Sequence, residues 1–376
     1  MTTNIHLHWK NSSAVTKFKT GVSLHSHTNL SEESLEIIPR YTERIPYLGA
    51  SIKAQERKYF ARTGKPLDFA RAFWTPPLSP LQALQLEAKQ ISAQGLKPLV
   101  SLSDHDNLQA GYNLSVLEAA QGTPVSVEWT IPFGTTYFHL GVHNLERSDA
   151  HDTMAELAAF TADPKPERLG ALLSMLNLDP ATLLVLNHPF WDEAGIGESE
   201  HGHTLGCLLE RHGALIHALE LNGLRSWPEN ARVAWLSRHT GIPVISGGDR
   251  HGCEPNSNIN LTNASTFAEF VEEVRVGRES IVLFMPQHRE PMRYRILQTM
   301  WDIMREYPDH PADRRKWSDR IFFRDENEEP KPVSTFFHGN EPAIVKQFSS
   351  LIRLVDIRTV RTVLRTALVD GEEASF

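Results

Sequence analysis

Two histidines one residue apart, His25 and His27, directly follow a short apolar run over residues 21–24. On a β-strand, residues i and i+2 face the same side, so both imidazoles are predicted to project together from the carboxyl end of a strand. Imidazole nitrogen is the commonest protein ligand for a metal ion. The pair therefore indicates a site for a divalent metal ion.

Four further strand-like runs also end in residues that can bind metals. These residues are, in chain order, Asp104-His105-Asp106, Glu128, His188 and Asp249-Arg-His251. Imidazoles and carboxylates repeated at the ends of successive strands are typical of a multinuclear metal site at one mouth of a barrel.

The elements that must position these side chains alternate through the first 285 residues. Strands are predicted over 21–25, 97–102, 123–128, 136–142, 183–187, 216–221, 243–247 and 280–284. Helix-like stretches lie between most of them, which predicts a mainly parallel sheet or barrel. The clearest helix covers 79–94, because Ser79 and Pro80 suit its N-cap and first turn. Further helices are expected over 163–176 and 229–240.

Residues 1–285 are predicted to form the main domain, with an insertion over about 33–78 that is rich in aromatic and basic residues. The insertion suits either a lid over the site or a surface elaboration. Residues 286–376 are predicted to be a mainly helical extension. Its apolar stripe at Val345, Phe348, Ile352 and Val355 suits a helix on the core or on a second subunit, so a homo-oligomer is an open possibility.

In order along the chain, six motifs resemble those of the polymerase and histidinol phosphatase (PHP) family. They are Leu24-His25-Ser-His27-Thr-Asn-Leu-Ser31-Glu32, Ser103-Asp104-His105-Asp106-Asn107, Val127-Glu128, Phe138-His139-Leu-Gly141, Asn187-His188-Pro189 and Ser246-Gly-Gly-Asp249-Arg-His251-Gly252. The resemblance covers roughly residues 20–285. It implies a distorted (β/α)7 barrel that binds two or three divalent ions and hydrolyses phosphate esters.

The resemblance also implies a set of metal ligands. They are His25, His27, Glu32, His105, Glu128, His139, His188, Asp249 and His251. Glu32 stands where the family usually has Asp, and Glu33 replaces the usual Gly, so either carboxylate could reach a metal. His143, four residues beyond His139, is a rival for the role of His139.

Such a cluster suits phosphoester hydrolysis. Metal ions neutralise phosphoryl oxygens, stabilise the leaving oxygen and lower the pKa of bound water toward ~7, so that a hydroxide held between them attacks phosphorus. Mixed imidazole and carboxylate ligands favour Mn, Zn or Fe over Mg alone. Catalytic roles are predicted for Glu128, as a bridge between two ions, for His251, and for Asp104 or Asp106, which either orient His105 or move a proton.

A phosphorylated substrate also needs cations from the protein. Arg225, just after a predicted strand, and Arg44, in the insertion, are candidates, and His203 could contact substrate from the loop after His188. Arg250 should face away from its neighbouring ligands and therefore suits a structural role. The arginines near the C-terminus, among them Arg361 and Arg365, are expected to form a solvated face.

The formal net charge of -8 argues against a general electrostatic grip on nucleic acid but allows a small phosphorylated substrate. No apolar stretch approaches the ~20 residues needed to span a bilayer, and two cysteines suit a reducing cytoplasm, so a cytoplasmic protein is predicted. Two other functions stay open. One is an amidohydrolase-type enzyme that cleaves a C–N or lactone bond, and the other is a non-catalytic, metal-stabilised regulatory module. The nearly complete ligand set favours an enzyme.

Overall fold

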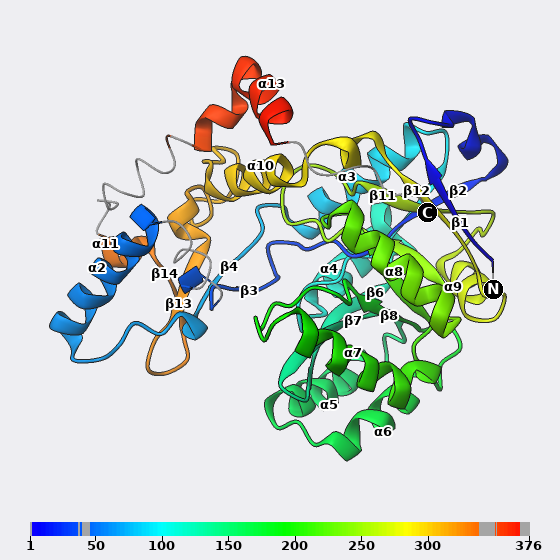
Figure 1. Ribbon diagram of the computed structural model, residues 1–376, viewed down its shortest axis with the longest axis horizontal. Coiled ribbons are helices and arrows are strands. Elements are labelled where there is room, and N and C mark those ends of the chain that lie inside the picture. The colour runs from blue at the N-terminus through cyan, green and yellow to red at the C-terminus, as the bar shows by residue number, and fades with distance from the viewer. Residues whose placement is uncertain (1, 37, 40–45, 338–349, 351, 369–376) are drawn as a thin grey trace.

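The computed structural model describes residues 2–36, 38–39, 46–337, 350 and 352–368. Two five-stranded sheets and their flanking helices form the main body, and a smaller four-stranded sheet lies to one side of it (Figure 1). The fold is therefore mixed α/β, as the alternation of strand-like and helix-like runs predicts.

The first large sheet has the strand order β1-β12-β11-β2-β5. Its strands are β1 (Thr2–Leu7), β2 (Thr20–Ser23), β5 (Lys97–Val100), β11 (Asn258–Thr262) and β12 (Glu279–Phe284). β2 runs parallel to β5, whereas β11 runs antiparallel to both of its neighbours. Helices α3 (Pro80–Ser92) and α4 (Gln109–Ser115) pack on this sheet through Ile91 and Leu114.

The second large sheet has the strand order β10-β9-β8-β7-β6. Its strands are β6 (Val125–Phe133), β7 (Thr136–Leu145), β8 (Leu183–Asn187), β9 (Ala218–Asn222) and β10 (Val244–Gly247). β8, β9 and β10 are parallel, but β7 is antiparallel to β6 and β8. The helices that follow these strands are α5 (Ala150–Ala162), α6 (Pro166–Leu176), α7 (Glu198–His212) and α8 (Trp227–Thr240).

An apolar layer joins the two large sheets. Val22 of β2, Val185 of β8 and Ile245 of β10 pack together with Phe270 of helix α9 (Phe267–Arg275). Within the described residues the ladders form two separate sheets and do not close into one barrel. Two single-residue parallel bridges link the two sheets: Ser26, after β2, pairs with Arg250, after β10, and His105, after β5, pairs with Glu128 of β6.

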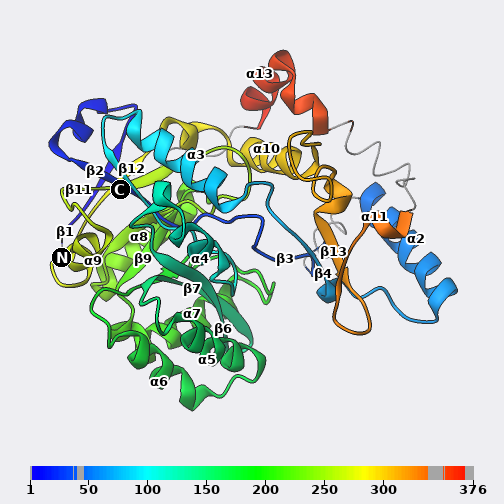
Figure 2. The ribbon, with the colours of Figure 1, turned by 180° about the vertical axis from the view of Figure 1, so that it is seen from behind.

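The insertion and the C-terminal extension together build the third sheet, of order β14-β13-β4-β3. Its strands are β3 (Glu33–Ser34), β4 (Ala72–Trp74), β13 (Ile321–Arg324) and β14 (Pro330–Pro332). β4 and β13 pair antiparallel although they are far apart in sequence, and Figure 2 shows them side by side. Helix α2 (Pro46–Thr63) and the short α11 (Ser334–Phe337) lie beside this sheet.

The rest of the extension contains two described α-helices, whereas Ile352 and Val355 of the predicted apolar stripe lie at a short 3-10 helix, Arg353–Asp356. α10 (Met292–Met304) and α13 (Arg358–Ala367) lie close together beside the main body (Figure 1). Strands β13 and β14 lie within this extension, which the sequence predicts to be mainly helical. Arg44, Val345 and Phe348 lie outside the described residues. The predicted domain limits at 285 and 286 stay a prediction, and no described helix is long and apolar enough to cross a membrane.

Candidate metal centre

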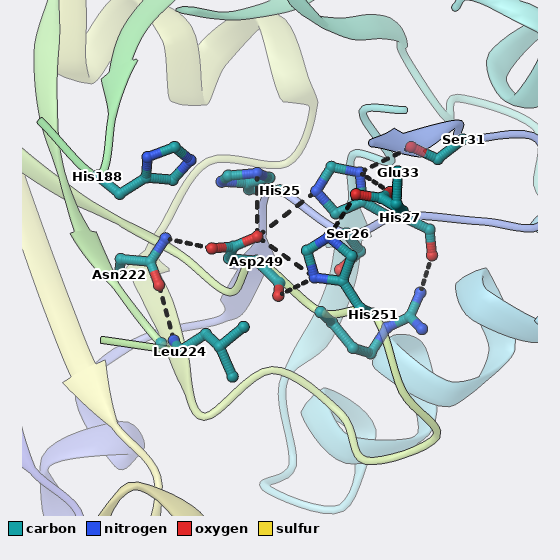
Figure 3. A network of polar contacts seen from close by, with 12 residues as sticks. His25, Ser26, His27, Ser31, Glu33, His188, Asn222, Leu224, Asp249 and His251 are labelled. Carbon is teal, nitrogen blue, oxygen red and sulfur yellow. Dashed lines mark hydrogen bonds and ion pairs between the residues drawn. The ribbon is translucent and has the colours of Figure 1, made fainter. Parts of the chain in front are cut away.

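Nine side chains from the central strands, from the loops that follow them and from β3 converge at one place. Their ligand atoms fall into four overlapping groups, in each of which all atoms lie within 4.8 Å of one another. The groups are His27, Glu33, His105 and His251; His25, His27 and Glu128; His25, His188 and Asp249; and His105, Glu128 and His139. Figure 3 shows His25, His27 and His251 gathered around Asp249, with Glu33 beside His27 and His251. We call these nine residues the metal cluster.

Glu128, near the middle of β6, is the centre of the cluster. One of its oxygens, Oε2, lies 2.9 Å from Nε2 of His25 and 3.3 Å from Nε2 of His27. The other, Oε1, lies 3.2 Å from Nε2 of His188 and 3.5 Å from Nδ1 of His139. Nδ1 of His105 also lies 3.4 Å from Oε2. A fully buried carboxylate with imidazoles at both oxygens is a candidate bridge between two metal positions.

A second carboxylate, Glu220 of β9, orients the cluster from behind. Its Oε1 lies 2.5 Å from Nδ1 of His25, and its Oε2 accepts hydrogen bonds from the backbone N–H of His188 and from the Asn222 amide. A carboxylate on Nδ1 fixes the imidazole tautomer and leaves Nε2 as the ligand atom. Asn222 also donates to Oδ2 of Asp249, so one buried network holds three members of the cluster.

The backbone turns sharply at three of these ligands. His25, His188 and Asp249 have φ values of 59°, 25° and 55°, in the left-handed region that non-glycine residues rarely adopt. Each such residue costs about 1–3 kcal/mol and persists only where the surroundings impose it. Gly247 shows how tight these surroundings are, because a Cβ there would lie 1.6 Å from Oε1 of Glu220.

Burial and charge set the protonation of the cluster. Burial acts to raise the pKa of Glu128, but the imidazoles of His25, His105 and His139 outweigh it and hold this pKa well below its usual range. Burial acts to lower the pKa of His25, but Glu128 and Glu220 raise it well above its usual value. The carboxylate is thus ionised, and His25 holds a proton that a metal ion must displace.

The structure distinguishes the two adjacent glutamates. Glu33 is buried, with Oε2 at 3.0 Å from Nε2 of His251 and 3.4 Å from Nε2 of His105. The side chain of Glu32 is 46% exposed and forms an ion pair with Arg324 of β13. Of the two carboxylates that the sequence leaves open, Glu33 therefore lies in the cluster and Glu32 points away from it.

The rival histidine and the two predicted catalytic aspartates lie behind the cluster. His143 is buried against Ser101, and burial lowers its pKa to about 3, so its imidazole is neutral. Both oxygens of Asp104 accept hydrogen bonds from Thr28, at 2.6 and 2.7 Å. Asp106 accepts one from the backbone N–H of Thr130. The structure thus places both aspartates where they fix the ligand-bearing loops, and their catalytic roles stay a prediction.

The predicted substrate contacts lie apart from one another. Arg225 is buried, with its guanidinium 3.8 Å from the Trp191 ring centroid and 3.3 Å from Oδ2 of Asp249. His203 is exposed on α7, where its Nε2 lies 3.8 Å from Sγ of Cys207, and it is not among the cluster residues. Arg250 forms a buried ion pair with Glu87, in agreement with the structural role expected for it.

Sequence reasoning does not single out Glu220, Glu193 or Trp74. Glu220 is one charged residue inside the apolar run 218–222, and a buried charge there requires a partner, which was a usable signal. Glu193 lies 4.0 Å from Nε2 of His139 in the loop after β8, and the Trp74 ring lies 5.8 Å from that of His251. No motif marks the last two residues.

Several buried polar atoms in the cluster fit a bound metal. Nε2 of His27, Nδ1 of His139 and Oε1 of Glu33 are buried without a hydrogen-bond partner among the described residues. A buried polar atom without a partner lowers the stability of the fold, so a bound ion that contacts it would remove this cost. The donor set of imidazoles and carboxylates suits Mn, Zn or Fe, so the residues present fit divalent ions.

No family model and no curated protein matches the sequence. Among solved structures, one similar chain is an amidohydrolase from Chromobacterium violaceum with bound sulfate and no metal. It has 14% identity and a TM-score of 0.36, and the match covers 61% of this chain and 87% of that one. Another is a proposed metal-dependent phosphoesterase from Bifidobacterium adolescentis, with 15% identity, a TM-score of 0.33 and coverage of 53% and 91%. At these TM-scores the likeness carries no functional argument, so the function must be inferred from the geometry of the chain itself.

Proposed function

We propose that this chain is a metal-dependent phosphoesterase of the PHP type that hydrolyses a small phosphorylated substrate. The observation that carries the proposal is the convergence of nine buried or half-buried ligand side chains, five of which are imidazoles within 3.5 Å of an oxygen of Glu128. A purely structural metal site closes with four ligands, whereas this cluster has enough donors for two or three ions.

The proposed metal positions share some of their donors. His25, His27 and Glu128 would hold one ion, and Asp249 with His188 extends this position. His105, His139 and Glu128 would hold another ion; His139 lies at Oε1 of Glu128, and Nδ1 of His105 lies 3.4 Å from Oε2. Divalent ions held there supply positive charge for the phosphoryl oxygens and acidify bound water.

A third set of donors favours phosphoryl chemistry. Glu33 and His251 form a four-donor group with His27 and His105, which also belong to the first two groups, and this group would hold a further ion. A phosphoryl group presents several charged oxygens at once, and its transfer depends mainly on positioning and on charge stabilisation. An additional cationic position therefore supports a phosphoester rather than a C–N or lactone bond as the substrate.

The protein's own residues keep this arrangement rigid and dry. Glu220 fixes the Nδ1 side of His25, and the carbonyl oxygen of Asp249 lies 2.9 Å from Nδ1 of His251, which turns Nε2 of both rings toward the cluster. Asn222 and Arg225 donate to Oδ2 of Asp249 and so hold its Oδ1 toward the histidines. We also propose that the two bridged sheets are a distorted form of the PHP barrel, because the bridges lie where its strands would close.

The test is metal analysis of the purified chain together with a panel of phosphomonoesters, amides and lactones. We expect bound Mn, Zn or Fe, hydrolysis of at least one phosphomonoester, and a loss of activity of about 1000-fold or more in the His25→Ala, Asp249→Ala double variant. His239→Ala, an exposed residue on α8, is the matched control and should retain activity. Activity confined to amides or lactones would support the amidohydrolase alternative, and bound metal without any hydrolysis would support the regulatory one.

A further inference from the structure

A cavity of about 290 Å³ adjoins the metal cluster. Asp249 and His251, two of the proposed ligands, line it together with the loop that follows them. Other lining residues come from α10 and α13 of the C-terminal extension, which lie together in Figure 1. The cavity therefore joins the proposed reaction centre to a part of the chain for which no function has been assigned.

Two helices each present one face to this cavity. Arg295, Gln298 and Thr299 of α10 line it, and they are spaced three and four residues apart on one side of the helix. Arg361 and Arg365 of α13 line it at the same spacing. The sequence predicts a solvated face for the arginines of α13, but the structure brings these two to the wall of a cavity.

The wall is fixed to the loop that carries the ligands. Arg295 donates hydrogen bonds to the carbonyl oxygen of Gly223 and, at 3.3 Å, to Oγ of Ser257. The backbone N–H of Cys253 donates to Asp302 of α10 at 2.7 Å, and a Cβ on Gly252 would lie 2.9 Å from the same carboxylate. These contacts set the position of α10 and of Arg295 relative to Asp249 and His251.

The charges along the wall favour an anion. The lining residues include four arginines, three of them from the two helices, and three carboxylates, those of Asp249, Glu254 and Glu290, whereas the chain as a whole carries a net charge of -8. One of the glutamates, Glu290, lies 2.6 Å from Nε of Arg365, and the other, Glu254, accepts a hydrogen bond from Gln298. Guanidinium groups bind phosphate and carboxylate through paired hydrogen bonds, so this wall suits a group with two or more charged oxygens.

We propose that this cavity binds a second anionic group of the substrate. The group is a phosphate or a carboxylate on the same small molecule whose phosphoester lies at the metal cluster, and Arg295, Arg361 and Arg365 hold it. This inference deepens the proposed function and rests on it. The C-terminal extension then determines substrate specificity, because it supplies all three of these arginines.

The test compares two non-hydrolysable ligands, propylphosphonate and the corresponding three-carbon bisphosphonate, by titration calorimetry on the metal-loaded full chain. We expect the wild type to bind the bisphosphonate about 100-fold more tightly, since hydrogen bonds between charged groups are strong. The Arg361→Gln, Arg365→Gln variant should lose this preference. Arg358→Gln, on the same helix but outside the cavity, should keep it. A three-carbon ligand with one phosphonate and one carboxylate shows which anion is preferred.

The outcomes separate the two proposals. Equal affinities for the two ligands in the wild type, or a preference that survives loss of both arginines, would overturn the anion subsite. Thermal melting in each case shows whether the double variant is folded, and Arg295→Lys offers a second variant that keeps the charge but loses the planar fork. If the bisphosphonate preference is found but no phosphoester is hydrolysed, the subsite stands and the phosphoesterase function fails.

Discussion

The donors of the metal cluster come from two regions that differ in how the chain assembles them. Eight of the nine lie on or just after strands of the two large sheets. The ninth, Glu33, opens β3 of the peripheral sheet, which is complete only when β4 pairs with β13. The eight depend on strands with local sequence signals, whereas the ninth depends on a pairing between distant parts of the chain. The site thus has a core that the central fold positions and one member that the appendages position.

Among the substitutions in the central sheets, Gly247→Ala should have the largest effect. The new Cβ would overlap the carboxylate of Glu220, so either the β10 backbone or Glu220 must move, and His25 loses its support. We expect a loss of about 1–3 kcal/mol in the free energy of unfolding together with loss of metal. Chemical denaturation and metal analysis measure the two effects. Gly206→Ala on α7, where a Cβ meets nothing within 4 Å, should be neutral or stabilising.

Glu220→Gln tests the same network without a change in size. The amide can no longer balance the charge on His25, and metal affinity should fall by about 10–100-fold, as for other residues that orient a ligand. Competition with a chelator gives the affinity. Glu210→Gln, exposed on α7, is the control, and an equal loss there would show that the effect is not specific to the network.

The peripheral region is tested by comparing the two adjacent glutamates. Glu33→Gln removes a buried carboxylate from three histidines, so we expect metal affinity at this position to fall by about 10-fold or more. Glu32→Gln removes only a partly exposed ion pair with Arg324, which is worth about 0–1 kcal/mol. Metal content and activity are measured for both variants. A larger loss in Glu32→Gln than in Glu33→Gln would show that Glu32, and not Glu33, is the ligand.

The smallest effect is the pH dependence of stability without metal. Glu128, Glu33 and Asp249 have pKa values held well below the usual range, so their contribution is present above about pH 4.5 and is lost as the pH falls through the lowered values. His25 has a raised pKa, so its contribution is present below 6.5 and is lost as the pH rises through the raised value.

Bound metal should have the opposite pH dependence to that of His25, so that its stabilising effect increases as the pH rises. Each ion replaces protons on the histidines, so the increase in melting temperature on adding metal should grow as the pH rises from 6 to 8. Melting curves with and without metal measure this increase, and calorimetry in two buffers with different ionisation enthalpies counts the protons released. An increase that is independent of pH would contradict the assignment of histidine ligands.

The two regions also differ in how well the sequence predicts them. The central strands are marked by apolar runs, and most of the predicted ligands stand at or just past the end of such a run; the full set, with His139 inside its strand, was listed from the resemblance of the motifs to those of the PHP family. Strand β11, Asn258–Thr262, has three polar residues in five and was not predicted. The antiparallel direction of β7 was also missed, because periodicity does not encode strand direction.

The choice between Glu32 and Glu33 could not be made from local pattern. Adjacent residues on a strand face opposite sides, so the choice depends on the register of β3 against β4, with Glu33 opposite Trp74. That register is supported in turn by β13, from the far end of the chain. Glu220 was missed for a different reason. Its role depends on its contact with His25, which is far away in the sequence.

The pairing of β4 with β13 also sets an order of events during biosynthesis. A ribosome that makes the chain from its N-terminus releases Glu33 early, but the strand that completes its sheet emerges only after the central sheets have been made. The eight ligands on the central sheets can reach their positions while translation continues, but Glu33 reaches its position only after β13 has been made. The last step of maturation is then the closing of the peripheral sheet, so a nascent chain that stops before β13 would hold metal less tightly than the finished protein.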